Sequence, residues 1–222
     1  MLKKATLSFP NVQLNPSQIH KFRGYIGHLF QEYDLIHNHD PATGKTIYRY
    51  PLVQFKVIDS MPVIIAITDE AVGIFSKIIK KMDKIIIQDA VIPVYEKNIQ
   101  IENVSFGYTS EQIVYVFVSP WIGLNQNNYN SYMRSDHPDK RFDLLTRIIV
   151  GNMLSMSKYL NYHLEKDQRI HANIDFHETT VTLKGKKMIG FNGFFKTNFL
   201  IPDNLGLGKS VSRGFGCVRR LI

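Results

Sequence analysis

Hydrophobic residues in the first hundred positions alternate between a period of two and a period of about 3.6. Runs rich in β-branched and aromatic residues predict strands, whereas apolar residues at every third or fourth position predict amphipathic helices. The predicted order is strand 3–9, helix 17–33, strand 46–58, strand 61–67, a helix after Thr68 and strand 84–94. This order is that of the split βαβ, or ferredoxin-like, unit.

The ends of the helix after Thr68 are well marked. Asp69 and Glu70 lie in its first turn and lysines lie in its last turn, which matches the signs of the helix dipole. The Thr68 hydroxyl is expected to cap the first turn. The earlier helix contains Gly24 and Gly27, each of which costs about 1 kcal/mol relative to alanine. We therefore expect the sheet, or a ligand, to approach that backbone closely.

The second half of the chain begins with the same pattern and ends differently. Its predicted elements are strand 112–121, a polar surface loop over 125–132, a long helix from Pro138, and a hairpin of strands 169–183 and 187–199. The tail, residues 200–222, is too rich in glycine for a stable second helix. The sequence predicts an α+β fold of two tandem ferredoxin-like (RRM-like) units. Residues 1–96 form the first, and residues 97–222 form a degenerate second with a glycine-rich C-terminal loop.

Composition narrows the class of protein. The 222 residues are 44% hydrophobic and 21% charged, as in an ordinary globular protein. Lysine and arginine outnumber aspartate and glutamate by 27 to 19, a net charge of +8 that favours polyanionic partners. Cys217 is the single cysteine, which excludes an intramolecular disulfide and a multi-cysteine zinc site. No apolar run is long enough for a signal peptide or a membrane span, so we expect a cytoplasmic protein.

Glycines in the tail are spaced symmetrically, as two Gly-x-Gly pairs separated by five residues. Glycine allows positive φ and close approach of a backbone to phosphate, and two cations lie between the pairs. A P-loop is excluded, because the glycine required ahead of Gly-Lys-Ser/Thr is absent at both candidate positions. An ordinary glycine loop remains the alternative. The candidate RNA-backbone residues are Gly206, Gly208, Lys209, Ser210, Arg213, Gly214 and Gly216.

These residues carry a family resemblance. The stretch "GLGKSVSRGFG" behind two ferredoxin-like units resembles the signature loop of the repeat-associated (RAMP) proteins of CRISPR systems. It is similar in particular to the sixth CRISPR-associated family, endoribonucleases that cut precursor CRISPR RNA within its repeats. The helix "HKFRGYIGHLF" followed by a histidine pair resembles the b-type branch of that family.

The resemblance implies that His37 and His39 are the catalytic pair. Two residues apart in an extended segment, their side chains point the same way, and imidazole can accept or donate a proton near neutral pH. One would deprotonate the ribose 2′-hydroxyl and the other would protonate the leaving 5′-oxygen. The expected products are a 2′,3′-cyclic phosphate and a 5′-hydroxyl, without a metal. Lys45 and Tyr48 would stabilise the phosphorane, while Arg23 and His28 would contact the RNA.

Two metal-dependent alternatives are less favoured. A His-x-His pair can ligate zinc or iron, but a site needs further ligands that the sequence does not identify. Residues 37–39 spell His-Asn-His, yet HNH nucleases separate these residues widely in a ββα fold, whereas here they are adjacent. We therefore expect neither a metal nor a cofactor.

The leading hypothesis is a metal-independent endoribonuclease that cleaves CRISPR repeat RNA in precursor crRNA. The alternative is a non-catalytic crRNA-binding subunit of a CRISPR effector complex with the same fold and loop. Repeat RNA is the expected partner, with effector-complex subunits and a second copy of the chain as further candidates and no membrane.

Overall fold

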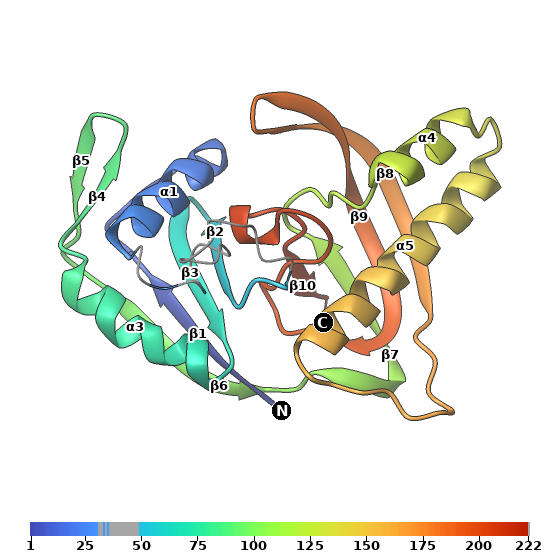
Figure 1. Cartoon of the computed structure of the whole chain (residues 1–222), viewed down its shortest axis with the longest axis horizontal. Coiled ribbons are helices and arrows are strands. Elements are labelled where there is room, and N and C mark those ends of the chain that lie inside the picture. Colours follow the sequence, from blue (N-terminus) through green and yellow to red (C-terminus); the bar gives the residue numbers. More distant parts are fainter. Residues whose placement is uncertain (31–32, 34, 36–48, 222) are drawn as a thin grey trace. The chain divides into compact units, whose positions relative to one another are not determined.

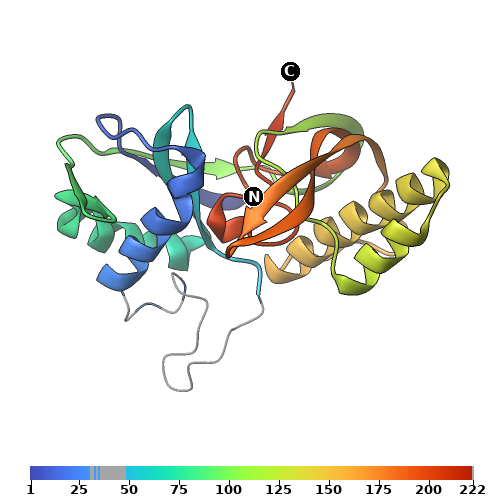
Figure 2. The same ribbon diagram turned by 90° about the horizontal axis from the view of Figure 1, so that it is seen from above.

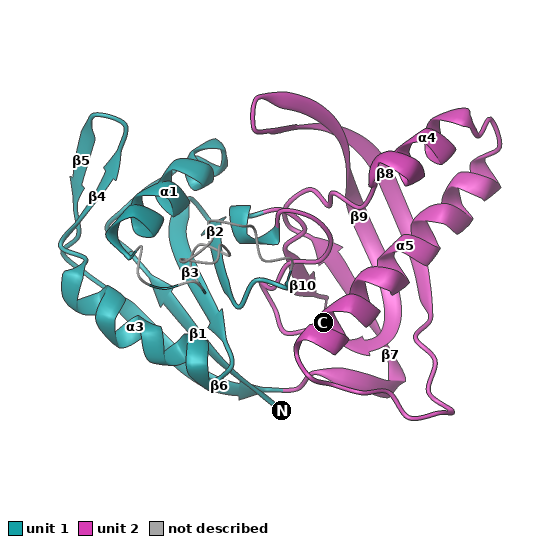
Figure 3. Ribbon diagram, in the orientation of Figure 1, with its two compact units in different colours: residues 1–104, 211–214 teal, residues 105–210, 215–222 magenta. Residues whose placement is uncertain are grey.

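The computed structural model describes residues 1–30, 33, 35 and 49–221. The chain divides into two compact units, residues 1–104 with 211–214 and residues 105–210 with 215–222 (Figure 3). Each unit contains its own antiparallel four-stranded sheet. The structure is therefore an α+β fold built on two four-stranded antiparallel sheets.

The sheet of unit 1 has the strand order β2-β3-β1-β6. Its strands are β1 (Leu2–Ser8), β2 (Val53–Ile58), β3 (Met61–Ile67) and β6 (Asn98–Val104). In β1 the buried apolar residues Ala5 and Leu7 alternate with the pleat, whereas β3 is buried on both faces from Val63 to Ile67. Two helices, α1 (Ile19–Leu29) and α3 (Asp69–Lys81), lie on the same side of the sheet (Figures 1 and 2). Their apolar faces form one core with it, including Phe22, Ile26, Ala71 and Phe75.

The fourth strand of this sheet differs from the prediction. Residues 84–94 form a separate hairpin of β4 (Lys84–Ile87) and β5 (Ala90–Pro93), turned at Gln88, whose φ is 58°. The sheet is instead completed by β6, which pairs with β1 along its whole length. The first compact unit consequently extends to residue 104, eight residues beyond the expected boundary after residue 96.

The starts of α1 and α3 differ from what the sequence predicted. A 3-10 turn, η1 (Pro16–Gln18), precedes α1, and the Asn15 side chain accepts a hydrogen bond from the Ser17 amide at 2.9 Å. Thr68 does occupy the N-cap position of α3, but its hydroxyl makes no capping bond and its φ is 85°. The predicted Thr68 cap is therefore wrong. The Thr68 amide donates to the Lys3 carbonyl instead, which fixes the residue in this conformation.

Unit 2 has the strand order β10-β7-β9-β8. Its elements are β7 (Gly107–Phe117), α4 (Gln126–Arg134), α5 (Pro138–Tyr159), β8 (Ala172–Leu183), β9 (Lys186–Leu200) and β10 (Val218–Arg220). The long helix from Pro138 and the hairpin turned at Lys184–Gly185 are confirmed. Counted along each sheet, both units have the order fourth, first, third, second strand. Residues 201–217, all described, contain a 3-10 turn, η2 (Val211–Arg213), where unit 1 has α3.

The segment expected to be a polar loop, residues 125–132, is mostly helical, because α4 occupies it. Asn125 starts the helix, since its side-chain oxygen accepts a hydrogen bond from the Asn128 amide at 2.7 Å. Tyr132 anchors it, with only 4% of its surface exposed. One capped end and one buried side chain are enough to order a segment whose composition is that of a loop.

Candidate nucleic-acid interface

Three cations from distant parts of the chain meet in unit 1. Arg23 comes from α1, Lys56 from β2, and Arg213 from η2. The Lys56 side chain is buried, and its Nζ donates to the Val211 carbonyl at 3.1 Å. This bond holds residues 211–214 against β2. We call Arg23, Lys56 and Arg213 the unit 1 cation cluster.

Two members of the cluster repel each other. Burial, and secondly the positive charge of Arg213, lower the pKa of the Arg23 guanidinium. In the described part of the chain no carboxylate forms an ion pair with Arg213. An anion bound between two such groups would relieve their repulsion and accept bidentate hydrogen bonds. A phosphate suits such a pair of guanidinium groups, because it carries negative charge and several acceptor oxygens.

The glycines of the tail are required by the loop's own folding. Gly208, Gly214 and Gly216 have φ of 85°, 90° and 63°, the left-handed region that glycine favours. A Cβ at Gly216 would overlap the Leu207 carbonyl, and a Cβ at Gly208 would lie 2.5 Å from the Trp121 indole nitrogen. Gly206 forms an isolated bridge with Cys217. The symmetric spacing thus has a structural cause that is independent of any ligand.

Several amides of this loop are already used inside the protein. The Lys209, Gly214 and Gly216 amides donate to the carbonyls of Ile122, Val211 and Pro120, at 2.9, 3.2 and 2.8 Å. The Lys209 ammonium donates to the Leu124 carbonyl at 2.9 Å, and burial lowers its pKa. Ser210 is partly buried, with φ of 57°. Any phosphate held here would therefore be held by cationic side chains more than by these three amides.

The structure separates the remaining candidates. Arg23 and His28 are five residues apart on α1, or about 140° around the helix axis at 3.6 residues per turn. They therefore do not share a face, although His28 is exposed. Gly24 is open as well, because a Cβ there would meet nothing within 4 Å, so the expected close packing of the sheet is absent at that glycine. His37, His39, Lys45 and Tyr48 lie outside the described residues.

Metal and membrane sites can be assessed only where the chain is described. In residues 1–30, 33, 35 and 49–221 no group of three histidine, cysteine, aspartate or glutamate side chains is placed to hold a metal ion. The histidine pair is not among those residues. None of the described helices is long and apolar enough to cross a membrane.

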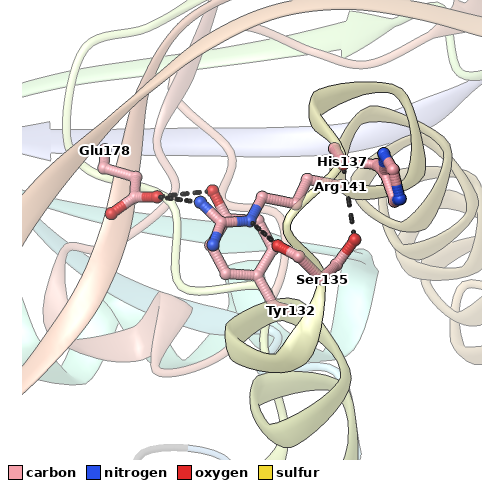
Figure 4. A network of polar contacts seen from close by, with 5 residues as sticks. All are labelled: Tyr132, Ser135, His137, Arg141 and Glu178. Carbon is pink, nitrogen blue, oxygen red and sulfur yellow. Dashed lines mark hydrogen bonds and ion pairs between the residues drawn. The ribbon is translucent and has the colours of Figure 1, made fainter.

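A polar network in unit 2 was not predicted from the sequence (Figure 4). The Tyr132 hydroxyl donates to Glu178 at 2.6 Å, and Arg141 lies over the Tyr132 ring, 4.8 Å from its centroid. The Arg141 guanidinium is 3.8 Å from the same carboxylate and also donates to the Ser135 carbonyl. Burial first, and then the bond to Glu178, raise the pKa of Tyr132 to about 12. The network fastens α4 and α5 to β8, and no signal in the sequence marks it.

The fold and the cluster define a basic, two-unit α+β protein with two antiparallel sheets of the same strand order. Models of the Cas6b N-terminal and C-terminal domains match residues 1–105 and 107–221. The chain therefore belongs to the Cas6b family.

Solved structures and a sequence relative agree with this assignment. A crystal structure of Cas6b is 37% identical, with a TM-score of 0.93 over 99% of both chains. A second, of a CRISPR RNA processing endoribonuclease Cas6b, is 35% identical with a TM-score of 0.79, again over 99% of both chains. An uncharacterized protein of Methanocaldococcus jannaschii is 47% identical over 117 residues, which are 52% of this chain and 78% of that protein.

Proposed function

We propose that this protein is an endoribonuclease that cleaves CRISPR repeat RNA within precursor crRNA. The observation that carries the proposal is the likeness to a CRISPR RNA processing endoribonuclease Cas6b, at 35% identity over 99% of both chains. The basic composition and the unit 1 cation cluster support an RNA substrate, since cations supply most of the affinity of proteins for nucleic acid.

His37 and His39 perform the chemistry in this proposal. One imidazole removes the proton of the ribose 2′-hydroxyl, whose oxygen attacks the adjacent phosphorus in line. The other gives a proton to the departing 5′-oxygen. The products are a 2′,3′-cyclic phosphate and a 5′-hydroxyl, and the step needs no metal. Lys45 and Tyr48 stabilise the charge on the phosphorane.

The RNA backbone is held by the two ferredoxin-like units in tandem, the second of which has the glycine-rich loop in place of its second helix. Arg23 and Arg213 bind phosphate in unit 1, and Lys209 binds phosphate in unit 2. His28 and Ser210 supply further contacts, while Gly206, Gly208, Gly214 and Gly216 give the loop the conformation that presents these cations.

The test is cleavage of a cognate repeat RNA in excess EDTA. We expect one cut, leaving a cyclic phosphate, and a loss of at least about 100-fold in rate for His37→Ala and for His39→Ala, because each proton transfer contributes about 10² to 10⁴-fold. His163→Ala, which removes an exposed histidine of unit 2, is the matched control. RNA with a 2′-deoxy nucleotide at the cleavage site must bind and remain intact.

Other outcomes assign other functions. Cleavage that EDTA abolishes would indicate a metal-dependent nuclease. Full activity of the double histidine variant would remove the catalytic assignment. Tight binding of repeat RNA without cleavage under any condition would favour the alternative, a crRNA-binding subunit of an effector complex, for which the cation cluster alone would suffice.

A further inference from the structure

A pocket of about 460 Å³ lies beside α5 in unit 2. We call it the α5 pocket. Its polar side chains are Asn125, Asn128, Arg147, Asn152 and Lys209, and Gly151 forms part of its wall. No acidic side chain lines it. The volume is within the range of about 300–1,000 Å³ that is usual for small-molecule sites.

Asn125 and Asn152 use their side-chain oxygens within the protein and keep their NH₂ groups spare. Asn152 accepts a hydrogen bond at 3.0 Å from the Trp121 indole, which can only donate, so the Asn152 oxygen must face Trp121. The Asn125 oxygen likewise accepts from the amide of Asn128. The NH₂ groups of both asparagines make no hydrogen bond within the described part of the chain. Both remain available as donors.

Lys209 and Arg147 also have N–H donors that make no hydrogen bond in the described part of the chain. The Lys209 ammonium has three N–H bonds, and one of them goes to the Leu124 carbonyl. Arg147 uses its Nε on the Asp143 carbonyl at 3.3 Å, which leaves both of its NH₂ groups. Neither forms an ion pair with a carboxylate in the part of the chain that the structure describes. The two cations and the two asparagine NH₂ groups outnumber the one spare side-chain acceptor among these residues, the Asn128 oxygen, so the pocket is complementary to an acceptor-rich anion.

Gly151 leaves this space open at a cost to the helix. It lies inside α5 and a Cβ there would meet nothing within 4 Å, although glycine in a helix interior is about 1 kcal/mol worse than alanine. Packing inside the protein therefore does not require this glycine. Its absence of a side chain does, however, add room to the α5 pocket.

A second hollow continues from the first. It also has a volume of about 460 Å³, shares Arg147 and Asn128 with the α5 pocket, and adds Lys140 and Asp143 from α5. Arg147 therefore lies where the two hollows join. Consecutive hollows joined by a cation fit consecutive units of a polyanionic chain better than one isolated small anion.

We propose that the α5 pocket binds one nucleotide of single-stranded RNA, with its phosphate between Lys209 and Arg147 and the next nucleotide in the adjoining hollow. The asparagine NH₂ groups donate to the oxygens of the phosphate or of the base. The inference rests on the proposed function in one respect, because the strand it binds is part of the repeat RNA.

The test measures the dissociation constant of labelled repeat RNA that carries a 2′-deoxy nucleotide at the cleavage site. Arg147→Gln should weaken binding about tenfold and reduce the slope of log affinity against log salt by about 0.7, the value for one phosphate of a single strand. Lys158→Gln removes a charge from an exposed position of the same helix outside both hollows and should change neither quantity.

A second pair of variants tests the space itself. Gly151→Leu should fill the α5 pocket and weaken RNA binding about tenfold, while the melting temperature stays the same or rises because leucine favours helix. Gly73→Leu is the matched control, since Gly73 is an equally open glycine inside α3 of unit 1. It should leave the RNA affinity unchanged.

The outcomes separate this inference from the proposed function. If the wild type binds repeat RNA and the Arg147 and Gly151 variants match their controls, the pocket inference is wrong and the endoribonuclease proposal stands. If the wild type binds no repeat RNA, the pocket inference and the endoribonuclease proposal are both wrong. If AMP binds the wild type but not Gly151→Leu, while the RNA affinity of that variant is unchanged, the pocket takes a free nucleotide and the RNA inference is wrong.

Discussion

Thr68 is the residue whose backbone is hardest to reconcile with its side chain. Its φ of 85° and ψ of 154° lie in a region that only glycine occupies readily. Its hydroxyl is buried and has no hydrogen-bond partner in the described part of the chain. A β-branched residue is the least suited to this conformation, so the position carries strain that neither a cap nor a side-chain bond offsets.

Thr68→Gly should therefore stabilise the protein by about 1 kcal/mol. Relief of backbone strain of about 1–3 kcal/mol exceeds the extra freedom that glycine gives the unfolded chain, about 0.4–1 kcal/mol. Urea unfolding followed by circular dichroism measures the difference. Thr68→Val keeps the β-branch and removes only the hydroxyl, so it should not reproduce the gain from relieved strain. A less stable Thr68→Gly protein would show that Thr68 is not strained.

At the scale of the elements, α4 is a polar helix that a tertiary contact holds to the sheet. The hydroxyl of Tyr132 links this helix to the sheet, through the bond to Glu178. Tyr132→Phe should lower the free energy of unfolding by about 1.5–3 kcal/mol, the usual contribution of a hydrogen bond to a charged group. Tyr129→Phe, an exposed tyrosine on the same helix, is the control and should be neutral in urea unfolding at neutral pH.

The stability that the Tyr132–Glu178 hydrogen bond contributes should decrease at high pH. The pKa of Tyr132 is raised to about 12, above the ordinary 10 of the unfolded chain. The stabilising bond is therefore complete below pH 10 and is lost as the pH rises through about 12. The stability difference between wild type and Tyr132→Phe should be constant from pH 7 to pH 9, roughly, and shrink above pH 10. A difference that declined already below pH 9 would contradict the assigned bond.

Helix α4 also shows which elements the hydrophobic pattern of the sequence does not predict. Hydrophobic periodicity predicted α5 and the β8–β9 hairpin, because both bury a regular apolar face. It missed α4, which depends on one asparagine cap and one tyrosine, and β6, whose seven residues are mostly exposed. Edge strands of this kind are specified by their partner strand more than by their own composition.

Candidate site residues divide in a similar way. The positive charge of the tail is visible in the sequence, so Arg213 and Lys209 were predicted to bind RNA, and this stays a prediction. Lys56 was not predicted, because nothing in the sequence of a strand indicates that its lysine will be buried against the Val211 carbonyl, 155 residues away. The glycine pattern is visible in the sequence, but the structure explains it by the loop's own conformation, and the predicted contact with RNA stays a prediction. Spacing alone cannot distinguish a glycine that lets a ligand approach the backbone from a glycine that the loop needs for its own conformation.

For the molecule as a whole, the excess of positive charge matters most where cations lie close together. The chain has a net charge of +8, and in unit 1 Arg23 and Arg213 repel each other in a partly buried place. Such an arrangement lowers stability and is retained only if something else benefits from it. An RNA phosphate that both guanidinium groups bind is the explanation that fits the proposed function.

Removing one charge should then have opposite effects on stability and on binding. Arg213→Gln should leave the protein as stable as the wild type or slightly more so, because repulsion on Arg23 is relieved. It should weaken repeat RNA binding about tenfold. The slope of log affinity against log salt concentration should fall by about 0.7 for the one phosphate contact that is lost. Arg134→Gln, at an exposed position on α4, is the control. A variant with lower stability and unchanged RNA affinity would make the Arg23–Arg213 pair a structural feature, and the RNA backbone would then be bound elsewhere.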